Sequence, residues 1–228
     1  MRLVILAVVC GAVCGCSSSA YDAAYAKRLA EYRIAAEFAP LRAEPVTLAD
    51  GRLNLRLPAA LVNQLDGKEA PNRSAPPFIR EFPGFLAAYE TLVEAPEGRF
   101  PIVLTVGLVP AGERRKDEVA ETILRQVRRD EEFTKAAWQK GREVVDLAGG
   151  VRKWDVLELE GDQTFEVEKA GLTADKRMPG RTEVWLSADP TQKASVILAF
   201  RVPSDAASRL PLPATAALTA RSVRLLEP

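Results

Sequence analysis

The sequence predicts an α+β protein: a mainly antiparallel β-sheet flanked by helices, preceded by a signal peptide and an amphipathic tether helix. Three observations predict it. Segments with apolar residues at alternate positions recur from residue 52 to residue 202. A long segment between them has apolar residues at helical spacing, and the first fifteen residues have the charge and apolar pattern of a secretory signal.

The N-terminal segment is a targeting signal and an anchor. Residues 1–15 place one positive charge, Arg2, before an apolar run that is too short for a spanning helix, which needs about 20 apolar residues. The sequence Val13-Cys14-Gly15-Cys16 resembles the lipobox of bacterial lipoproteins, with an aliphatic residue and a small residue before the lipidated cysteine. The resemblance implies a signal peptide over 1–15 and acyl chains, palmitate among them, on Cys16. A cleaved signal with incidental cysteines is the alternative.

Residues 16–45 are expected to hold the lipid anchor, a Ser-rich start and an amphipathic helix over 20–38. Ser19 and Asp22 form a capping-box pattern. One helical face carries Tyr21, Tyr25, Leu29, Tyr32 and Ala36. We expect this face to pack on the protein's own domain; an interfacial or self-associating helix is the alternative. Pro40 and Pro45 end the segment, and residues 46–228 are expected to form a single α+β domain.

The sequence of the first part of the domain predicts three strands. Residues 52–57 alternate strictly and stop at Pro58, and residues 59–84 are Pro-rich and irregular. Strands are expected over 85–94 and 102–109, joined around residues 96–98. The second has apolar residues in both phases, which predicts a central strand covered on both faces.

The second part predicts a helix followed by a meander. The helix is expected over 117–140, with the stripe Val119, Ile123 and Val127 and a stop at Lys140-Gly141. The meander is expected to begin with strands 144–148 and 151–160 around a Gly149-Gly150 turn. A second hairpin is expected from Gly161-Asp162 into 164–167. A polar loop through 176–180 would then lead to strands 182–188 and 194–202. A short helix with Pro213 in its first turn then leads to the C-terminus.

This order of elements resembles the Mog1/PsbP-like family over residues 46–226. The resemblance rests on RLNLRLP early in the domain, the apolar strand before the 117–140 helix, the meander, and a late helix into SVRLL. It implies the α+β fold and a mostly non-catalytic role, and it transfers no site residues.

Composition excludes many kinds of chemistry. The chain has no histidine, and Cys10, Cys14 and Cys16 are its only cysteines. This excludes Ser-His and Cys-His hydrolases, imidazole zinc sites and, beyond residue 16, thiol chemistry. Equal numbers of basic and acidic residues, 31 each, argue against nucleic acid as a partner. No catalytic, cofactor-binding or metal-ligating residue is predicted, and no cofactor.

One group of side chains in the meander is a candidate ligand platform. Strand phase places Trp154, Trp185 and Ile197 on one face, beside Glu158 and Glu183, with an aliphatic set on the other face. Aromatic rings beside carboxylates suit a sugar or an apolar ligand, and paired carboxylates suit glycosidic hydrolysis. The competing interpretation is a second core face covered by the 117–140 helix, with the glutamates at its wet rim.

These features predict a membrane-anchored extracytoplasmic lipoprotein with a non-catalytic binding domain. Its partner would be a protein, an envelope component or a small ligand. The alternatives are a secreted carboxylate-based hydrolase acting on envelope glycans and a self-associating envelope scaffold that uses the 20–38 helix. Ser17, directly after the lipid cysteine, predicts the outer membrane facing the periplasm if the source is a diderm bacterium.

Overall fold

The computed structural model describes residues 17–65, 82–95, 98–110, 112–147, 149–188 and 194–226. The chain divides into two units, residues 1–39 and 40–228. In the first unit, helix α1 spans Ser17–Glu37, so Ser19, expected just before the helix, lies inside α1. Tyr21, Tyr25 and Tyr32 are exposed to 70, 59 and 77%. The predicted signal and Cys16 lie outside the described residues.

No helix in the described ranges combines the length and the apolar character needed to cross a membrane.

The second unit contains a large antiparallel sheet in the order β3-β4-β5-β9-β8-β7-β6. Its strands are β3 (Asn63–Gln64), β4 (Phe85–Ala95), β5 (Gly98–Pro110), β6 (Gln139–Val145), β7 (Val151–Lys169), β8 (Leu172–Ala188) and β9 (Ala194–Pro203). A small antiparallel sheet joins β1 (Val46–Leu48), β2 (Leu53–Leu55) and β10 (Arg224–Leu225). The helices are α3 (Lys116–Val127), α4 (Leu212–Ser222) and the 3-10 turns η1 (Glu131–Phe133) and η2 (Ser204–Ala206).

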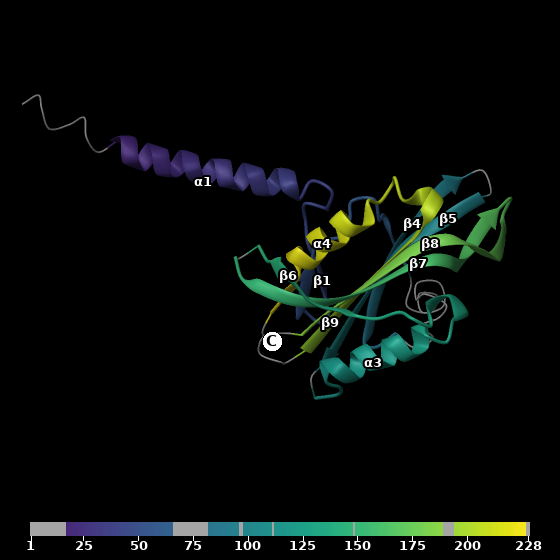
Figure 1. The fold of residues 1–228 in the computed structure, drawn as a ribbon. Coiled ribbons are helices and arrows are strands. Elements are labelled where there is room, and N and C mark those ends of the chain that lie inside the picture. Colours follow the sequence, from purple (N-terminus) through teal and green to yellow (C-terminus); the bar gives the residue numbers. More distant parts are fainter. Residues whose placement is uncertain are drawn as a thin grey trace, which may run out of the picture. The chain divides into compact units, whose positions relative to one another are not determined.

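Different elements cover the two faces of the large sheet (Figure 1). On one face, the stripe of α3 (Val119, Ile123, Val127) packs with Leu157, Val184, Leu186 and Ile197. On the other face, α4 and the small sheet contribute Leu53, Leu55, Leu212 and Ala216 to a core with Trp154, Trp185, Leu198 and Phe200. The α+β class with a mainly antiparallel sheet flanked by helices is therefore confirmed.

Several expected elements are present with shifted bounds. The 85–94 and 102–109 strands are β4 and β5, and every residue from Ile102 to Val109 is buried, as expected for a central strand. The 212–222 helix has proline in its first turn. The strand expected at 52–57 is only Leu53–Leu55, and it belongs to the small sheet.

The helix expected over 117–140 is wrong in length, because α3 ends at Val127. The next position on its apolar stripe is Glu131, so continuing the helix would bury no further apolar side chain. Instead, the Asp130 side chain accepts a hydrogen bond from the Glu132 backbone N–H at 3.0 Å and caps η1. Lys140 and Gly141, expected as the helix stop, lie in β6.

The hairpin expected at Gly161 and the loop expected through 176–180 are also wrong. Strand β7 continues to Lys169 and β8 begins at Leu172, so the turn lies at Ala170 and Gly171, both with positive φ. Gly161 and Gly180 are paired with each other inside this long hairpin. Glycine at these positions provides the room that the ladder needs, because a Cβ on Gly180 would lie 2.4 Å from the Phe165 ring.

Candidate functional site

The strand register brings the predicted platform residues together. Glu158 on β7 lies directly opposite Glu183 on β8, and Val156 lies opposite Trp185. Trp154, two residues before Val156, therefore shares this face with Trp185 and both glutamates. The two indole rings meet edge to face with centroids 6.0 Å apart. We call these four residues, with Arg142 and Arg181, the tryptophan cluster.

Both tryptophan rings lie in the core. Trp154 and Trp185 have no exposed surface, and they pack in the same apolar cluster as the leucines of β2 and α4. A ring without accessible surface has no face on which a sugar can stack in this conformation. A ligand role for the two rings stays a prediction.

Two arginines engage the glutamates of the cluster. A terminal nitrogen of Arg181 lies 3.0 Å from Glu183 Oε1 and 3.7 Å from Glu158 Oε2, so one guanidinium bridges both carboxylates. Arg142 on β6 donates to Glu158 Oε1 at 2.9 Å, and its guanidinium lies 5.2 Å from the centre of a Trp185 ring. These contacts make both carboxylates ion-pair partners of arginine.

Glu183 is the most buried carboxylate of the cluster. It has no exposed surface, and the Trp185 indole N–H donates to its Oε2 at 3.1 Å. Burial raises the pKa of the Glu183 carboxyl above its ordinary value, while the Trp185 hydrogen bond and the Arg181 charge oppose the rise. A raised carboxyl pKa suits a general acid, but a side chain without accessible surface cannot touch a glycan in this conformation.

Two expectations about this face are wrong. Ile197 packs on the opposite face with α3, because Trp185 is opposite Leu198 in the ladder and Ile197 points the other way. Helix α3 covers that opposite face, whereas α4 and the small sheet cover the tryptophans. The Ile197 error has one cause: strand phase alone does not say how β8 and β9 are aligned, and a shift of one residue reverses the face.

A second candidate site lies where the β4–β5 and β7–β8 hairpins end. Strand β9 pairs with β5 only as far as Val103, and beyond that point β7 reaches β5 directly, with Arg99 opposite Glu168. An open hollow of about 400 Å³ lies between the hairpin ends; we call it the hairpin-end hollow. Its lining is Glu94, Gly98, Arg99, Glu168, Lys169, Ala170 and Gly171.

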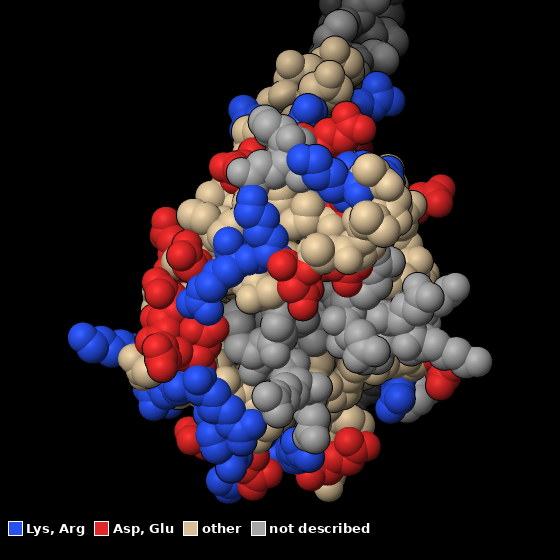
Figure 2. All heavy atoms as spheres, turned by 90° about the vertical axis from the view of Figure 1, so that its right-hand side faces the viewer, with Lys and Arg blue, Asp and Glu red and all other residues tan. Residues whose placement is uncertain are grey.

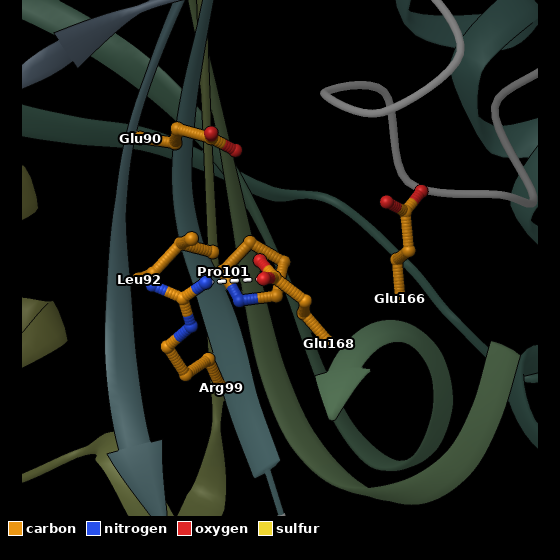
Figure 3. A pocket seen from close by; sticks show the side chains of 6 residues that line it. All are labelled: Glu90, Leu92, Arg99, Pro101, Glu166 and Glu168. Atoms are coloured by element: carbon orange, nitrogen blue, oxygen red, sulfur yellow. Dashed lines mark hydrogen bonds and ion pairs between the residues drawn. The ribbon is translucent and has the colours of Figure 1, made fainter. Parts of the chain in front are cut away.

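The Arg99–Glu168 ion pair joins the two hairpins at the hollow. Figure 3 shows this pair beside a smaller adjoining depression, where Glu90 and Glu166 extend from the two hairpins. Figure 2 shows the side of the molecule on which the hairpins end, where acidic and basic side chains form adjoining patches. The hollow thus offers charges of both signs to a partner.

A small separate core holds the hairpin ends in place. It consists of Phe100, Phe165, Val167 and Met178. The Arg201 guanidinium lies 4.2 Å from the centre of the Phe165 ring, and Arg201 is 5% exposed. Burial lowers the pKa of Arg201 to about 9, and the Asp175 carboxylate opposes this shift. Gly98 completes the contact, since a Cβ there would lie 2.8 Å from the Glu168 carbonyl oxygen.

Sequence reasoning missed the hairpin-end hollow. Arg99 and Glu168 are 69 positions apart, and neither belongs to a motif. The available signal was Gly98, within the predicted turn over 96–98, but nothing in the sequence pairs it with β7. Within the described parts of the chain, no group of three or more acidic side chains is placed to hold a metal ion.

Comparison with known proteins finds only distant structural similarity. No family model matches the chain, and no curated protein matches it. Solved structures align with it at low identity. A Bacteroides thetaiotaomicron protein is 9% identical with a TM-score of 0.39, over 81% of this chain and 48% of that one. The chain therefore spans about half the length of that protein.

Two further structures belong to the group that the sequence resembles. The Synechocystis PsbP (CyanoP) is 12% identical with a TM-score of 0.39, covering 82% of this chain and 94% of its own. The Saccharomyces cerevisiae Ran-binding protein Mog1p is 14% identical with a TM-score of 0.39, covering 82% and 97%. Structures of the group that the sequence resembles are therefore among the chain's distant structural neighbours. Similarity this low carries no argument about function.

Proposed function

We propose that this protein is an extracytoplasmic lipoprotein, anchored through Cys16, whose domain binds a partner protein at the hairpin-end hollow. The observation that carries the proposal is the hollow itself: two hairpins from distant parts of the chain meet there around the Arg99–Glu168 ion pair. Anchorage rests on the Val13–Cys16 sequence.

A protein partner suits the hollow better than a small apolar ligand. Small-molecule pockets are mostly apolar and enclose the ligand, whereas this hollow is open and lined by Glu94, Arg99, Glu168 and Lys169. Charges of both signs give orientation and specificity to a protein interface. Arg99 has a side chain 46% exposed and a fixed carboxylate partner, and arginine is among the residues enriched at interface hot spots.

Binding is also favoured over hydrolysis by the state of the predicted carboxylates. Arg181 bridges Glu158 and Glu183, and Glu183 also accepts from the Trp185 indole. Hydrolysis needs one carboxyl poised as an acid and a second poised as a base or nucleophile, both in contact with the sugar. Glu183, without exposed surface, makes no such contact in this conformation.

The anchor is tested by metabolic labelling with an alkyne fatty acid in a bacterial host that processes lipoproteins. The wild-type protein should incorporate label and fractionate with membranes, and Cys16→Ala should lose both properties. Cys14→Ala is the matched control and should keep them, because Cys14 lies in the part that is removed. Membrane retention of the wild type without label would contradict the anchor.

The binding surface is tested by site-specific photo-crosslinking in the same cells. A crosslinking residue at Leu172, 76% exposed beside the hollow, should give a discrete protein adduct. The same residue at Val151, 57% exposed at the far end of the β7–β8 hairpin, is the control and should give none. Arg99→Ala should abolish the Leu172 adduct without altering the unfolding transition. Equal adducts at both positions, or an adduct insensitive to Arg99→Ala, would refute this surface.

A further inference from the structure

We propose that the partner at the hairpin-end hollow contributes an extended segment, which adds as a strand to the free edge of β8 over residues 172–178. The strand addition rests on the proposed function, since it says how the partner protein is held there. Three features of the β7–β8 hairpin support it: the direction of its backbone groups, what occupies each of its two edges, and the charges along the free edge.

The turn of the β7–β8 hairpin fixes which backbone groups point outward. Ala170 and Gly171 both have positive φ, as in a type I′ turn, so the N–H of Leu172 points at Lys169. The direction of these groups alternates along an antiparallel strand, and the pairing of β7 with β8 is continuous here. The even-numbered residues of 172–178 therefore face β7. The odd-numbered ones, which we call the outward residues, face the other side: Thr173, Asp175 and Arg177.

No described strand occupies that other side of β8. Strand β9 pairs with β8 only as far as Gly180, which lies opposite Pro203, the last residue of β9. The next pair of the β5–β9 ladder would be Pro101 with Pro203, and neither has an N–H to donate. The ladder stops there, and among the described residues β8 has no strand partner on this side over 172–179.

The other edge of the same hairpin is already in use. On β7, the backbone of the even-numbered residues faces away from β8, and Glu168 pairs there with Arg99 of β5. The Thr164 carbonyl, on the same edge, accepts a hydrogen bond from Arg201. Contacts within the domain thus cover the edge of β7, whereas the outward residues of β8 are exposed.

An extended peptide is the ligand that fits such an edge. Each of the three outward residues presents an N–H and a C=O on one side, which is the pattern that β-strand addition uses. The edge begins at Ala170 and Gly171, which also line the hairpin-end hollow, so a partner seated in the hollow lies beside it. Leu172, 76% exposed at the start of the edge, offers an apolar contact at the same place.

The charges on the edge favour a different protein over a second copy of this chain. An antiparallel pair of two β8 strands uses all three outward residues of both copies only when it is centred on Asp175, which places one Asp175 opposite the other. Like charges directly opposite each other destabilise a strand pair, whereas opposite charges stabilise it. We therefore expect the partner segment to place a lysine or an arginine opposite Asp175.

The test separates the backbone of the edge from its side chains. Asp175→Pro removes the outward N–H at the middle of the edge and leaves the ladder with β7 in place, because the lost donor faces away from β7. Strand β8 already holds a proline at an odd-numbered position, Pro179. Asp175→Ala is the matched control, since it removes the same side chain and keeps the N–H.

In the cells used for photo-crosslinking, we expect Asp175→Pro to reduce the Leu172 adduct about tenfold and Asp175→Ala to keep most of it. Equal losses in the two variants, or an adduct lost in Arg99→Ala but unchanged in Asp175→Pro, would overturn the strand addition and leave the hollow as the binding surface. An adduct of two copies of this chain would overturn it in favour of a second copy. No adduct in the wild type would overturn the proposed surface and the strand addition together.

A second measurement does not depend on how a variant folds. Mass spectrometry of the adduct identifies the crosslinked segment, which is synthesised as a peptide and added to the purified wild-type protein. The peptide should slow amide hydrogen exchange at the outward residues about tenfold and leave the ladder amides between them nearly unchanged. N-methylation of alternate peptide residues should abolish binding in one phase only, because only one phase faces β8. Equal effects of the two phases, or unchanged exchange at the outward residues, would overturn the strand addition.

Discussion

Trp185 provides a quantitative test of the tryptophan cluster, because burial and ligand binding predict opposite outcomes for its removal. The ring has no exposed surface, packs on Trp154, and donates a hydrogen bond to Glu183 at 3.1 Å. Truncating a buried tryptophan to alanine costs about 3–5 kcal/mol of unfolding free energy. Trp185→Ala also leaves the buried Glu183 oxygen without its donor, which places the expected loss at the upper end of that range.

A matched pair of phenylalanine variants separates the hydrogen bond from ring packing. Trp185→Phe keeps an aromatic ring but removes the N–H that Glu183 accepts, a bond to an ionisable group worth about 1.5–3 kcal/mol. Trp154→Phe makes the same chemical change at a position equally buried, where the indole N–H has no partner among the described residues. We therefore expect Trp185→Phe to destabilise more than Trp154→Phe by about 1–2 kcal/mol.

Urea unfolding followed by circular dichroism measures these free energies, with the slope of each transition as a check that the unfolded states match. Val151→Ala, at an exposed position, is the control and should change stability by less than about 0.5 kcal/mol. A loss below about 2 kcal/mol for Trp185→Ala would refute the core assignment. Such a result, together with intact folding and altered ligand binding, would restore the predicted platform.

Two further predictions concern pH and packing. Burial raises the pKa of the Glu183 carboxyl, so the folded protein binds the carboxyl proton more tightly than the unfolded chain does. The unfolding free energy therefore falls as the pH rises from the ordinary carboxyl pKa to the raised pKa of the folded state. Glu183→Gln should remove that part of the slope in urea titrations that start at the ordinary carboxyl pKa and proceed upward. Identical slopes in both proteins would contradict the assignment. Gly180→Ala places a Cβ 2.4 Å from the Phe165 ring and should cost about 1–3 kcal/mol. Gly112→Ala, with nothing within 4 Å of its Cβ, should be close to neutral, and equal midpoints for the two variants would refute the packing argument.

The spacing of apolar residues within single segments correctly predicted a buried strand and the packed side of a helix. The apolar residues of 102–109 occupy both strand phases, and that strand is buried on both faces in the structure. The stripe Val119, Ile123 and Val127 indicated which side of α3 packs on the sheet. Each of these inferences needs only the spacing of the apolar residues along one segment.

The failures occur where the result depends on pairing between distant segments. The faces of Trp185 and Ile197 depend on the alignment of β8 with β9, which strand phase does not contain. The chain continues as strand through Gly161, which pairs with Gly180. A Cβ would be crowded at both positions, by Glu132 at Gly161 and by the Phe165 ring at Gly180. Gly161 alone has the pattern of a turn, and only the partner strand shows that it lies within a hairpin.

The covering of both sheet faces limits where this domain can bind anything. Helix α3 occupies one face, and α4 with the small sheet occupies the other, so the middle of the described sheet presents little surface to a partner. Beyond Val103, β9 no longer pairs with β5, and the hairpin of β7 and β8 closes the gap around Arg99. The hollow there exists because two hairpins extend past their neighbour, and its charged lining stays accessible because the small core around Phe165 supports it from within. Binding at strand ends, away from the helices that stabilise the sheet, allows the lining to vary without loss of the core, as is general for sites built on a rigid scaffold.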